Sequence, residues 1–226
     1  MDARLRLSIV MPALDEADGI ARSLRALAPL RTRGHEVIVV DGGSSDATVE
    51  LARPLADRVL SAPPGRALQM NAGARAAAGE ALVFLHADTR LPDHADELVS
   101  RALERGVWGR FDVDIDSRHR LLKTVGCVMN LRSRLTGIAT GDQAIFVRRE
   151  AFPGFEEIAL MEDIAFSRTM KRRAPPACLR ERVSTSARRW EAHGVLRTLL
   201  LMWRLRLLYA LGVPAQRLAR EYAQYR

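Results

Sequence analysis

The chain has only two cysteines, few aromatic residues and no long uninterrupted apolar run. Cys127 and Cys178 form neither a CxxC pair nor a zinc-ligand spacing, which is typical of a protein from a reducing compartment. Aromatic residues make up only 5% of the chain and the basic residues are dispersed, whereas nucleic-acid-binding modules interleave clustered Lys and Arg with aromatics. The most apolar stretch, residues 195–213, contains three arginines, which would be costly in a membrane span. We therefore expect a cytoplasmic protein with no nucleic-acid partner and no transmembrane helix.

The composition is otherwise that of a globular protein with a basic surface. Of the 226 residues, 48% are hydrophobic and 27% are charged, which is enough for one sizeable core. The formal net charge of +8 favours anionic partners such as nucleotides or an acidic membrane surface. A basic surface that is merely solvated is the alternative interpretation.

Apolar segments alternate with helical patterns through the first half of the chain. We expect strands at 7–11, 36–40, 58–62 and 81–87, and helices at 15–28, 47–56, 66–78 and from Pro92 onward. This alternation predicts an α/β protein whose mostly parallel sheet is covered on both faces. Ligands of such sheets bind beyond the carboxyl ends of the strands. That rule directs attention to residues 12–16, 41–46 and 86–89.

The pattern changes after about residue 106. Here we expect strands at 107–115 and 143–149, and helices at 118–135 and from Glu162 onward. No internal repeat and no low-complexity linker divides the chain. The sequence therefore predicts one α/β domain over residues 1–226, with a mixed sheet in its second half and helices at its C-terminal end.

The helix expected over residues 195–211 is apolar nearly all round. Arg197 and Arg204 share one face, and Arg206 falls on the opposite one. A helix of this kind is buried or contacts another surface. Three interpretations stay open: packing on the domain itself, packing in a homodimer, and peripheral contact with the inner face of a membrane.

The segment DGGSSD, residues 41–46, follows a buried strand and precedes a helix. Two glycines allow a sharp turn and leave room for a ligand, and the following helix N-terminus attracts anions. The carboxylate of Asp41 can accept a hydrogen bond from a base N–H or a ribose hydroxyl. The segment lacks the GxGxxG dinucleotide fingerprint, and a plain strand–turn–helix connection is the structural alternative.

The segment FLHADT, residues 84–89, places His86 and Asp88 at the end of another apolar strand. Side chains two apart on a strand point the same way, so we expect both groups on one face. An aspartate suits Mg²⁺ or Mn²⁺, and an imidazole suits Mn²⁺ better than Mg²⁺. A turn in which Asp88 only caps the backbone is the alternative.

Two further segments carry charged side chains of chemical interest. Glu162 and Asp163 begin an expected helix, where one carboxylate is a candidate general base and simple helix capping is the alternative. Residues 188–190 read Arg-Arg-Trp, which can clamp a diphosphate and offer a stacking face. An exposed basic turn is the alternative for this second segment.

Taken together, these segments resemble the family 2 glycosyltransferases of the GT-A fold. The resemblance covers roughly residues 5–190 and rests on the segments SIVMPALDE, VVDGGSSDAT, FLHADT, GDQAIFVRRE and MEDIAFSRTMKR. The wording of GRALQMNAGARAAAGEALVFLHADT and WGRFDVDI is similar to a short, soluble bacterial branch associated with radical-SAM partners and arsenosugar formation. The family would place a Rossmann-like nucleotide-sugar half at residues 1–105, an acceptor half at 106–190 and a helical segment at 191–226.

The resemblance also implies roles for individual residues. Asp163 would be the base of an inverting single displacement, and Asp88 with His86 would hold Mn²⁺ or Mg²⁺ on the donor diphosphate. The nucleotide-sugar site would comprise Pro12, Ala13, Glu16, Asp41, Gly43, Arg66, His86 and Ala87. The acceptor or the phosphates would be met by Gly141, Asp142, Glu162, Arg189 and Trp190.

Two positions depart from the family pattern. His86 stands where the D-x-D motif has its first aspartate, which favours Mn²⁺ over Mg²⁺, and Ser186 stands where the processive members have the Gln of Q-x-x-R-W. We therefore expect a non-processive transfer of sugar, from a UDP-sugar, to a small-molecule or lipid-linked acceptor. The alternatives are a nucleotidyltransferase and a catalytically degenerate basic binding or scaffold protein.

Overall fold

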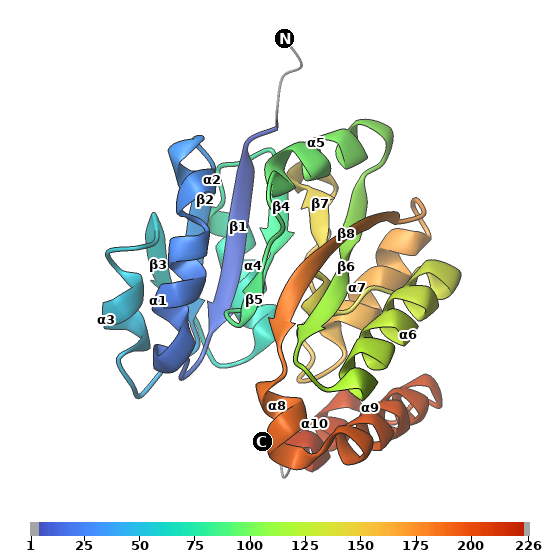
Figure 1. The fold of residues 1–226 in the computed structure, drawn as a ribbon. Helices are drawn as coiled ribbons and strands as arrows, with labels where there is room; N and C mark the ends of the chain where they lie inside the picture. The colour runs from blue at the N-terminus through green and yellow to red at the C-terminus, as the bar shows by residue number, and fades with distance from the viewer. Residues whose placement is uncertain (1–4, 224–226) are drawn as a thin grey trace.

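A curled sheet of eight strands forms the centre of the molecule in residues 5–223, the part of the chain described by this computed structural model (Figure 1). The strands lie in the order β3-β2-β1-β4-β7-β6-β8-β5. Their bounds are β1 Leu7–Ala13, β2 Glu36–Asp41, β3 Arg58–Ser61, β4 Ala81–Phe84, β5 Thr89–Arg90, β6 Trp108–Asp116, β7 Phe146–Arg148 and β8 Ala177–Ser186. Strands β3, β2, β1 and β4 run parallel, as the alternating sequence predicts.

Helices cover both faces of this sheet. Their bounds are α1 Ala17–Ala26, α2 Ala28–Thr32, α3 Thr48–Ala52, α4 Arg66–Ala76, α5 Ala95–Arg105, α6 Arg120–Thr136, α7 Glu162–Lys171, α8 Arg188–His193, α9 Val195–Ala210 and α10 Ala215–Ala223. Short 3₁₀ turns occupy Gly141–Gln143 and Arg149–Ala151. The expected helix over 15–28 is α1, which α2 follows as a separate short helix, and the one over 47–56 is a shorter α3.

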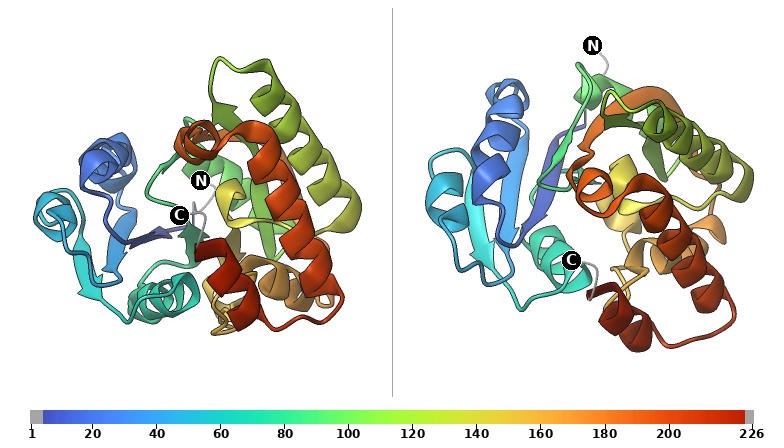
Figure 2. Two further views of the ribbon diagram at one scale, coloured as in Figure 1. Left: turned by 90° about the horizontal axis from the view of Figure 1, so that it is seen from below. Right: turned by 60° about the horizontal axis from the view of Figure 1, so that its bottom comes forward.

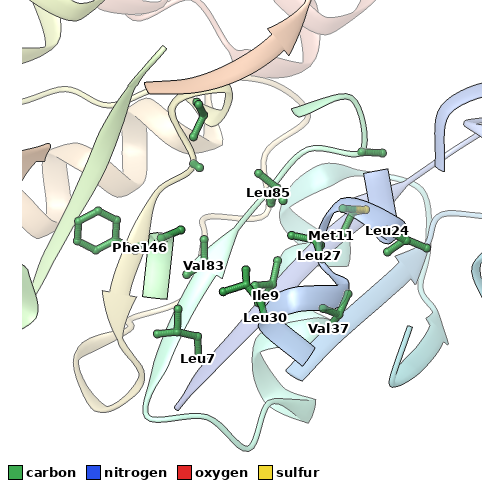
Figure 3. Close-up of a cluster of buried hydrophobic side chains, with 14 of the residues drawn as sticks. Leu7, Ile9, Met11, Leu24, Leu27, Leu30, Val37, Val83, Leu85 and Phe146 are labelled. Carbon is green, nitrogen blue, oxygen red and sulfur yellow. The ribbon is translucent and has the colours of Figure 1, made fainter. Parts of the chain in front are cut away.

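The central strands are apolar on both faces because both faces are covered. Ile9 of β1 packs with α1, α2 and α5, while its neighbour Val10 packs with α4 and α7 on the opposite face. Figure 3 shows the first of these two clusters, which brings β1 together with Leu24, Val37 and Val83. The alternation of side chains along one strand therefore builds two cores, one on each side of the sheet.

Helix α4 approaches the sheet closely because it is rich in small residues. A Cβ at Gly73 would stand 2.4 Å from a methyl group of Val10 and 3.0 Å from one of Val40. Any larger residue at position 73 would push the helix away from β1 and β2. The small residue therefore fixes the position of Arg66 at the first turn of α4, next to the carboxyl end of β1.

The second half of the sheet is mixed, and here the structure corrects two expected boundaries. Strand β4 ends at Phe84 instead of residue 87, because its pairing with antiparallel β7 stops at Val83 opposite Phe146. The strand expected at 143–149 is only Phe146–Arg148, since a 3₁₀ turn takes up its first residues. Strand β8, which the sequence patterns did not predict, pairs in parallel with β6 and antiparallel with β5.

The C-terminal helices lie beside α6 and α7, next to the second half of the sheet (Figures 1 and 2). One face of α9 packs through Leu201 and Leu205 on Met161, Ile164 and α10. Its first turns contact α6 and α8 through Val195 and Leu199. The helix expected over 195–211 thus forms and packs on the chain itself. Within residues 5–223, every helix is too short or too polar to cross a bilayer.

Candidate active site

A cavity of about 520 Å³ opens where β1 and β4 end at their carboxyl sides. Its walls come from the loop after β1, the turn after β4, and helices α4, α6, α7, α8, α9 and α10. Ten predicted site residues line it: Pro12, Ala13, Glu16, Arg66, His86, Ala87, Asp88, Asp142, Glu162 and Trp190. Among the described side chains, the lining omits four other predicted residues: Asp41, Gly43, Gly141 and Asp163. The fold thus gathers segments from across the chain at the edge that parallel-sheet topology predicts.

His86 and Asp88 both face this cavity, although from a turn and not from a strand. The N–H of Thr89 donates to the carbonyl of His86 at 3.0 Å and closes the turn. The N–H of Ser186 on β8 donates to the carbonyl of Asp88 at 3.2 Å and fixes it from the other side. His86 Nδ1 lies 3.3 Å from Asp142 Oδ1. A hard divalent cation needs few protein ligands when a diphosphate supplies the rest. The side chains of His86 and Asp88 suit such an ion.

Among the described residues, no three His, Cys, Asp or Glu side chains are grouped closely enough to hold a metal by themselves. The two candidates that face the cavity are an imidazole and a carboxylate, His86 and Asp88. This donor set fits Mn²⁺ or Mg²⁺ bound jointly with phosphate oxygens and water. It does not fit a preformed metal centre made by protein ligands alone.

Gly141 lies between the His86 side and the Asp163 side of the site. A Cβ on this residue would stand 2.5 Å from both Cε1 and Nε2 of His86, so only glycine lets the ring take this position. The N–H of Gly141 donates to Asp163 Oδ2 at 2.9 Å. One backbone unit therefore packs against the candidate metal ligand and orients the candidate base.

Asp163 stands in the first turn of α7. Its Oδ1 accepts a hydrogen bond from the N–H of Ile164 at 2.7 Å. Each carboxylate oxygen therefore accepts one backbone hydrogen bond and keeps a lone pair for a proton. This arrangement holds the carboxylate in place without using up its capacity as a base.

Glu162, the neighbour of Asp163, has a different environment. Burial raises the pKa of Glu162 above its ordinary value, the charge of Asp163 adds to the rise, and the charge of Arg66 opposes it. The Arg66 guanidinium lies 3.8 Å from Glu162 Oε1. The carboxylates of Glu162 and Asp163 therefore have different environments. Glu162 forms an ion pair with Arg66 at the cavity wall.

The loop after β2 uses the carboxylate of Asp41 internally. Asp41 is 5% exposed and accepts hydrogen bonds from the N–H groups of Gly43 at 2.9 Å and Ser44 at 3.1 Å. Gly43 has φ of +93°, a conformation that favours glycine. Asp41 and Gly43 therefore shape the loop beside the cavity, and the predicted contact between Asp41 and the base stays a prediction.

Gln69 is a site residue that the sequence patterns missed. Its Nε2 donates to the carbonyls of Ala13 and Val40, both at 2.8 Å, and its side chain reaches the cavity wall. The amide thereby joins the ends of β1 and β2, where the loops that follow these two strands begin. A glutamine inside an Ala-rich helix gives no local signal of this role.

Helix α8 carries the Arg-Arg-Trp segment. Arg188 donates to Glu16 Oε2 at 2.8 Å, and Trp190 lines the cavity. Arg189 lies on the same helix, but its side chain is outside what the structure describes. The segment therefore contacts the loop after β1 through Arg188, and the predicted role of Arg189 stays a prediction.

Arg132 of α6 and Arg206 of α9 also line the cavity and were missed by the sequence patterns. Nε and Nη2 of Arg132 are buried and have no hydrogen-bond partner among residues 5–223. Burial first, and then the charges of Arg206 and Arg110, lower the pKa of Arg132 to about 10, with Asp163 and Asp142 opposing the change. Basic residues on a helix look solvated in the sequence, so only the packing reveals this pair.

Comparison with known proteins places the chain in a family. The profile described as Glycosyl transferase family 2 matches residues 8–152. Uncharacterized glycosyltransferase YibD of Escherichia coli K12 is 28% identical over 111 residues, which are 46% of this chain and 32% of YibD. The chain therefore spans only about a third of that relative.

Solved structures share the fold. TarS 1–349 of S. aureus in complex with UDP-GlcNAc matches with a TM-score of 0.65 at 18% identity, covering 80% of this chain and 58% of the other. Glucosyl-3-phosphoglycerate synthase from Mycobacterium tuberculosis, in complex with Mn²⁺, UDP and glucosyl-3-phosphoglycerate, matches with a TM-score of 0.61 at 20% identity, covering 94% and 82%. The sheet and its helices have the GT-A fold of these enzymes. Because the family profile matches more than half of its residues, the chain belongs to glycosyl transferase family 2.

Proposed function

We propose that this protein is a metal-dependent, inverting glycosyltransferase that moves a sugar from a nucleoside diphosphate sugar to an acceptor hydroxyl. One observation carries the proposal: Gly141 packs against His86, which lines the cavity, and donates to Asp163, so one backbone unit contacts both the candidate metal ligand and the candidate base. The family match and the UDP bound in the two solved relatives support a uridine donor. Residues 1–105 would hold the donor and residues 106–190 the acceptor.

The residues of this chain have distinct tasks in the proposed reaction. Asp88 and His86 would hold Mn²⁺ or Mg²⁺, which neutralises charge on the departing diphosphate when bound. Pro12, Ala13 and Glu16 line the donor end of the cavity. Arg66 and Arg188 add positive charge near the phosphates, which stabilises the leaving group.

Asp163 would take the proton from the acceptor hydroxyl. The hydroxyl oxygen forms a bond to the anomeric carbon as the bond from that carbon to the diphosphate oxygen breaks. The nucleoside diphosphate leaves on the opposite side of the sugar, so the configuration inverts. Hydrogen bonds from Gly141 and Ile164 keep the carboxylate oriented during this step.

The two cysteines support a proposal for the cellular compartment. Cys127 and Cys178 are free thiols, which supports a cytoplasmic, reducing compartment. Assignment to the branch associated with radical-SAM partners and arsenosugar formation stays a prediction, and so does the sugar. A nucleotidyltransferase, the competing function, would release pyrophosphate instead of a nucleoside diphosphate, so product analysis separates the two.

The first test is thermal stabilisation by UDP, GDP, CDP and ADP, each with Mn²⁺, Mg²⁺ or EDTA. A ligand at a hundred times its Kd stabilises the folded state by about 2.7 kcal/mol. We expect a shift with UDP and Mn²⁺ that EDTA and Asp88→Ala both abolish. Asp93→Ala, which removes an exposed carboxylate nearby, is the matched control and should bind like the wild type. Absence of a shift with every nucleotide would overturn the proposal.

A further inference from the structure

The cavity has a second region that the donor and the base do not use. Between α6 and α9 it is lined by apolar side chains and two arginines: Leu121, Val128 and Arg132 from α6, and Leu196, Trp203 and Arg206 from α9. We call this region the α6–α9 groove. Figures 1 and 2 show the two helices side by side, with α9 running along α6. Asp142 and Glu162 line the same cavity, and the proposed function assigns both to the acceptor side.

Arg132 provides the first argument about what enters the groove. Its Nε and Nη2 are buried and lack a hydrogen-bond partner among the described residues. Buried guanidinium N–H groups without a hydrogen-bond partner destabilise the fold. The charge of Arg206 increases this cost. An anionic group bound between the two arginines would accept hydrogen bonds from Arg132 and offset the repulsion between the two charges, whereas a neutral sugar hydroxyl could accept a hydrogen bond but would not offset the charge.

The outer edges of the groove provide the second argument. Nine of the ten strongly exposed large apolar side chains in residues 5–223 lie on α6, on α9 or at Leu211, directly after α9. On α9 they recur at Leu196, Leu200, Trp203 and Leu207, which is one helical stripe, and Leu200 is 64% exposed. A contiguous apolar surface of this kind marks a contact surface. Neither helix contains an acidic residue, and together they carry seven basic ones.

We infer that the acceptor is an anionic lipid: its charged head lies between Arg132 and Arg206, and its hydrocarbon chain runs through the α6–α9 groove into a membrane on which the outer stripe rests. The inference rests on the proposed function and names the acceptor class for that site. Charge complementarity supports an anionic membrane as the occupant of the stripe. A soluble amphiphile would fill the groove but would leave Leu200 and Leu207 in water.

The head-group part is tested with two probes that differ only in their chain, methyl phosphate and decyl phosphate below its micelle concentration. We expect calorimetry to give at least tenfold tighter binding of decyl phosphate. Arg132→Gln should weaken both probes about tenfold. Leu196→Ser/Trp203→Ser should remove only the preference for the longer chain, while Leu51→Ser, an exposed leucine on α3, should change nothing. Equal affinity of the two probes for the wild type, or wild-type binding by Arg132→Gln, would overturn the inference.

The membrane part is tested by flotation with vesicles of phosphatidylcholine, with and without phosphatidylglycerol. We expect flotation only with the anionic lipid, and loss of it in Leu200→Ser/Leu207→Ser. No flotation of the wild type, or a dimer that this double variant converts to monomers in sedimentation, would overturn the inference. Stabilisation by UDP and Mn²⁺ is measured on every variant. If the nucleotide shift fails, the proposed function fails; if it persists while lipid binding fails, only the acceptor class is wrong.

Discussion

The guanidinium of Arg188 donates a hydrogen bond to the Glu16 carboxylate at 2.8 Å, joining α8 to the loop after β1 across 172 positions of sequence. This contact with Glu16, and the nearby charge of Asp88, raise the pKa of Arg188. The pair therefore connects the end of the sheet proposed to bind the donor with the helix that follows β8. It also holds a fixed positive charge beside the place proposed for the diphosphate.

Arg188→Ala separates stability from donor binding. Both partners are partly exposed, so we expect the free energy of unfolding to fall by less than about 1 kcal/mol. The affinity for UDP with Mn²⁺ should fall about tenfold, since the lost charge lies beside the place proposed for the phosphates. Arg90→Ala removes another exposed ion pair, that with Asp116, and serves as the matched control. An unchanged UDP affinity in Arg188→Ala would show that the residue only links the two segments.

Asp163→Asn tests the base. The amide keeps the shape of the side chain but cannot take a proton, so we expect the transfer rate to fall about 10²- to 10⁴-fold. Binding of UDP with Mn²⁺ should stay within about twofold of the wild type, because Asp163 is not part of the donor end of the cavity. Initial-rate and calorimetric measurements on one preparation give both numbers. Turnover close to that of the wild type would remove Asp163 from this role.

Gly141→Ala tests the packing between Gly141 and His86. The new methyl group would overlap the imidazole, so the ring must turn away. We expect the affinity for UDP with Mn²⁺, measured by thermal stabilisation, to fall at least tenfold. The free energy of unfolding should change little, because an imidazole ring can move at a lower energetic cost than the backbone. If the effect acts through His86, Gly141→Ala/His86→Ala should bind no worse than His86→Ala alone. Additive losses in this double-mutant cycle would contradict that explanation.

Asp96 controls the acid stability of the sheet region. It is buried, accepts two hydrogen bonds from Arg33 and lies 3.0 Å from His35 Nε2. Burial raises its pKa, but Arg33 and His35 outweigh burial and lower the pKa to about 2. A depressed folded-state pKa gives stability that is present above the unfolded-state value and is lost as the pH falls toward 2.

Asp96→Asn should therefore cost about 2 kcal/mol of unfolding free energy at pH 7. The difference between wild type and variant should shrink as the pH falls from about 4 to about 2, where the wild-type carboxyl becomes neutral. Urea unfolding across this range measures it, with Asp93→Asn as an exposed control. A difference that does not vary with pH would show that the contribution of Asp96 is not its charge.

The sequence predicted the first half of the fold well because its central strands are buried on both faces. In β1, β2 and β4 each apolar run marks a strand, and the topology rule then brings Pro12 and His86 to one edge of the sheet. Strand β8 gave no such signal. Its exposed middle, residues 180–182, is charged, and its pairing with β6 contains a register shift. Only the tertiary partners make this segment a strand.

The candidate site was predictable where polar residues follow a strand or lie near the start of a helix, and unpredictable in the interiors of α4 and α6. His86 and Asp88 were found through their place after β4, even though the turn there replaces the expected strand. Gln69 and Arg132 occupy helix interiors, where a polar side chain is most often solvated. Their roles depend on which elements pack against α4 and α6, and local sequence does not contain that information.

The turn that holds Asp88 has a consequence for the order in which the protein is made. Its backbone is secured by Ser186, and Thr89 is secured by Thr185, both on β8. On a ribosome the parallel strands β1 to β4 emerge about a hundred residues before this partner strand does. A nascent chain ending before residue 177 would therefore have most of its parallel sheet, but the turn with the proposed metal ligand Asp88 would be unsupported. We therefore expect the chain to bind the donor only after β8 has been synthesised, and not as soon as β4 and the turn after it have emerged.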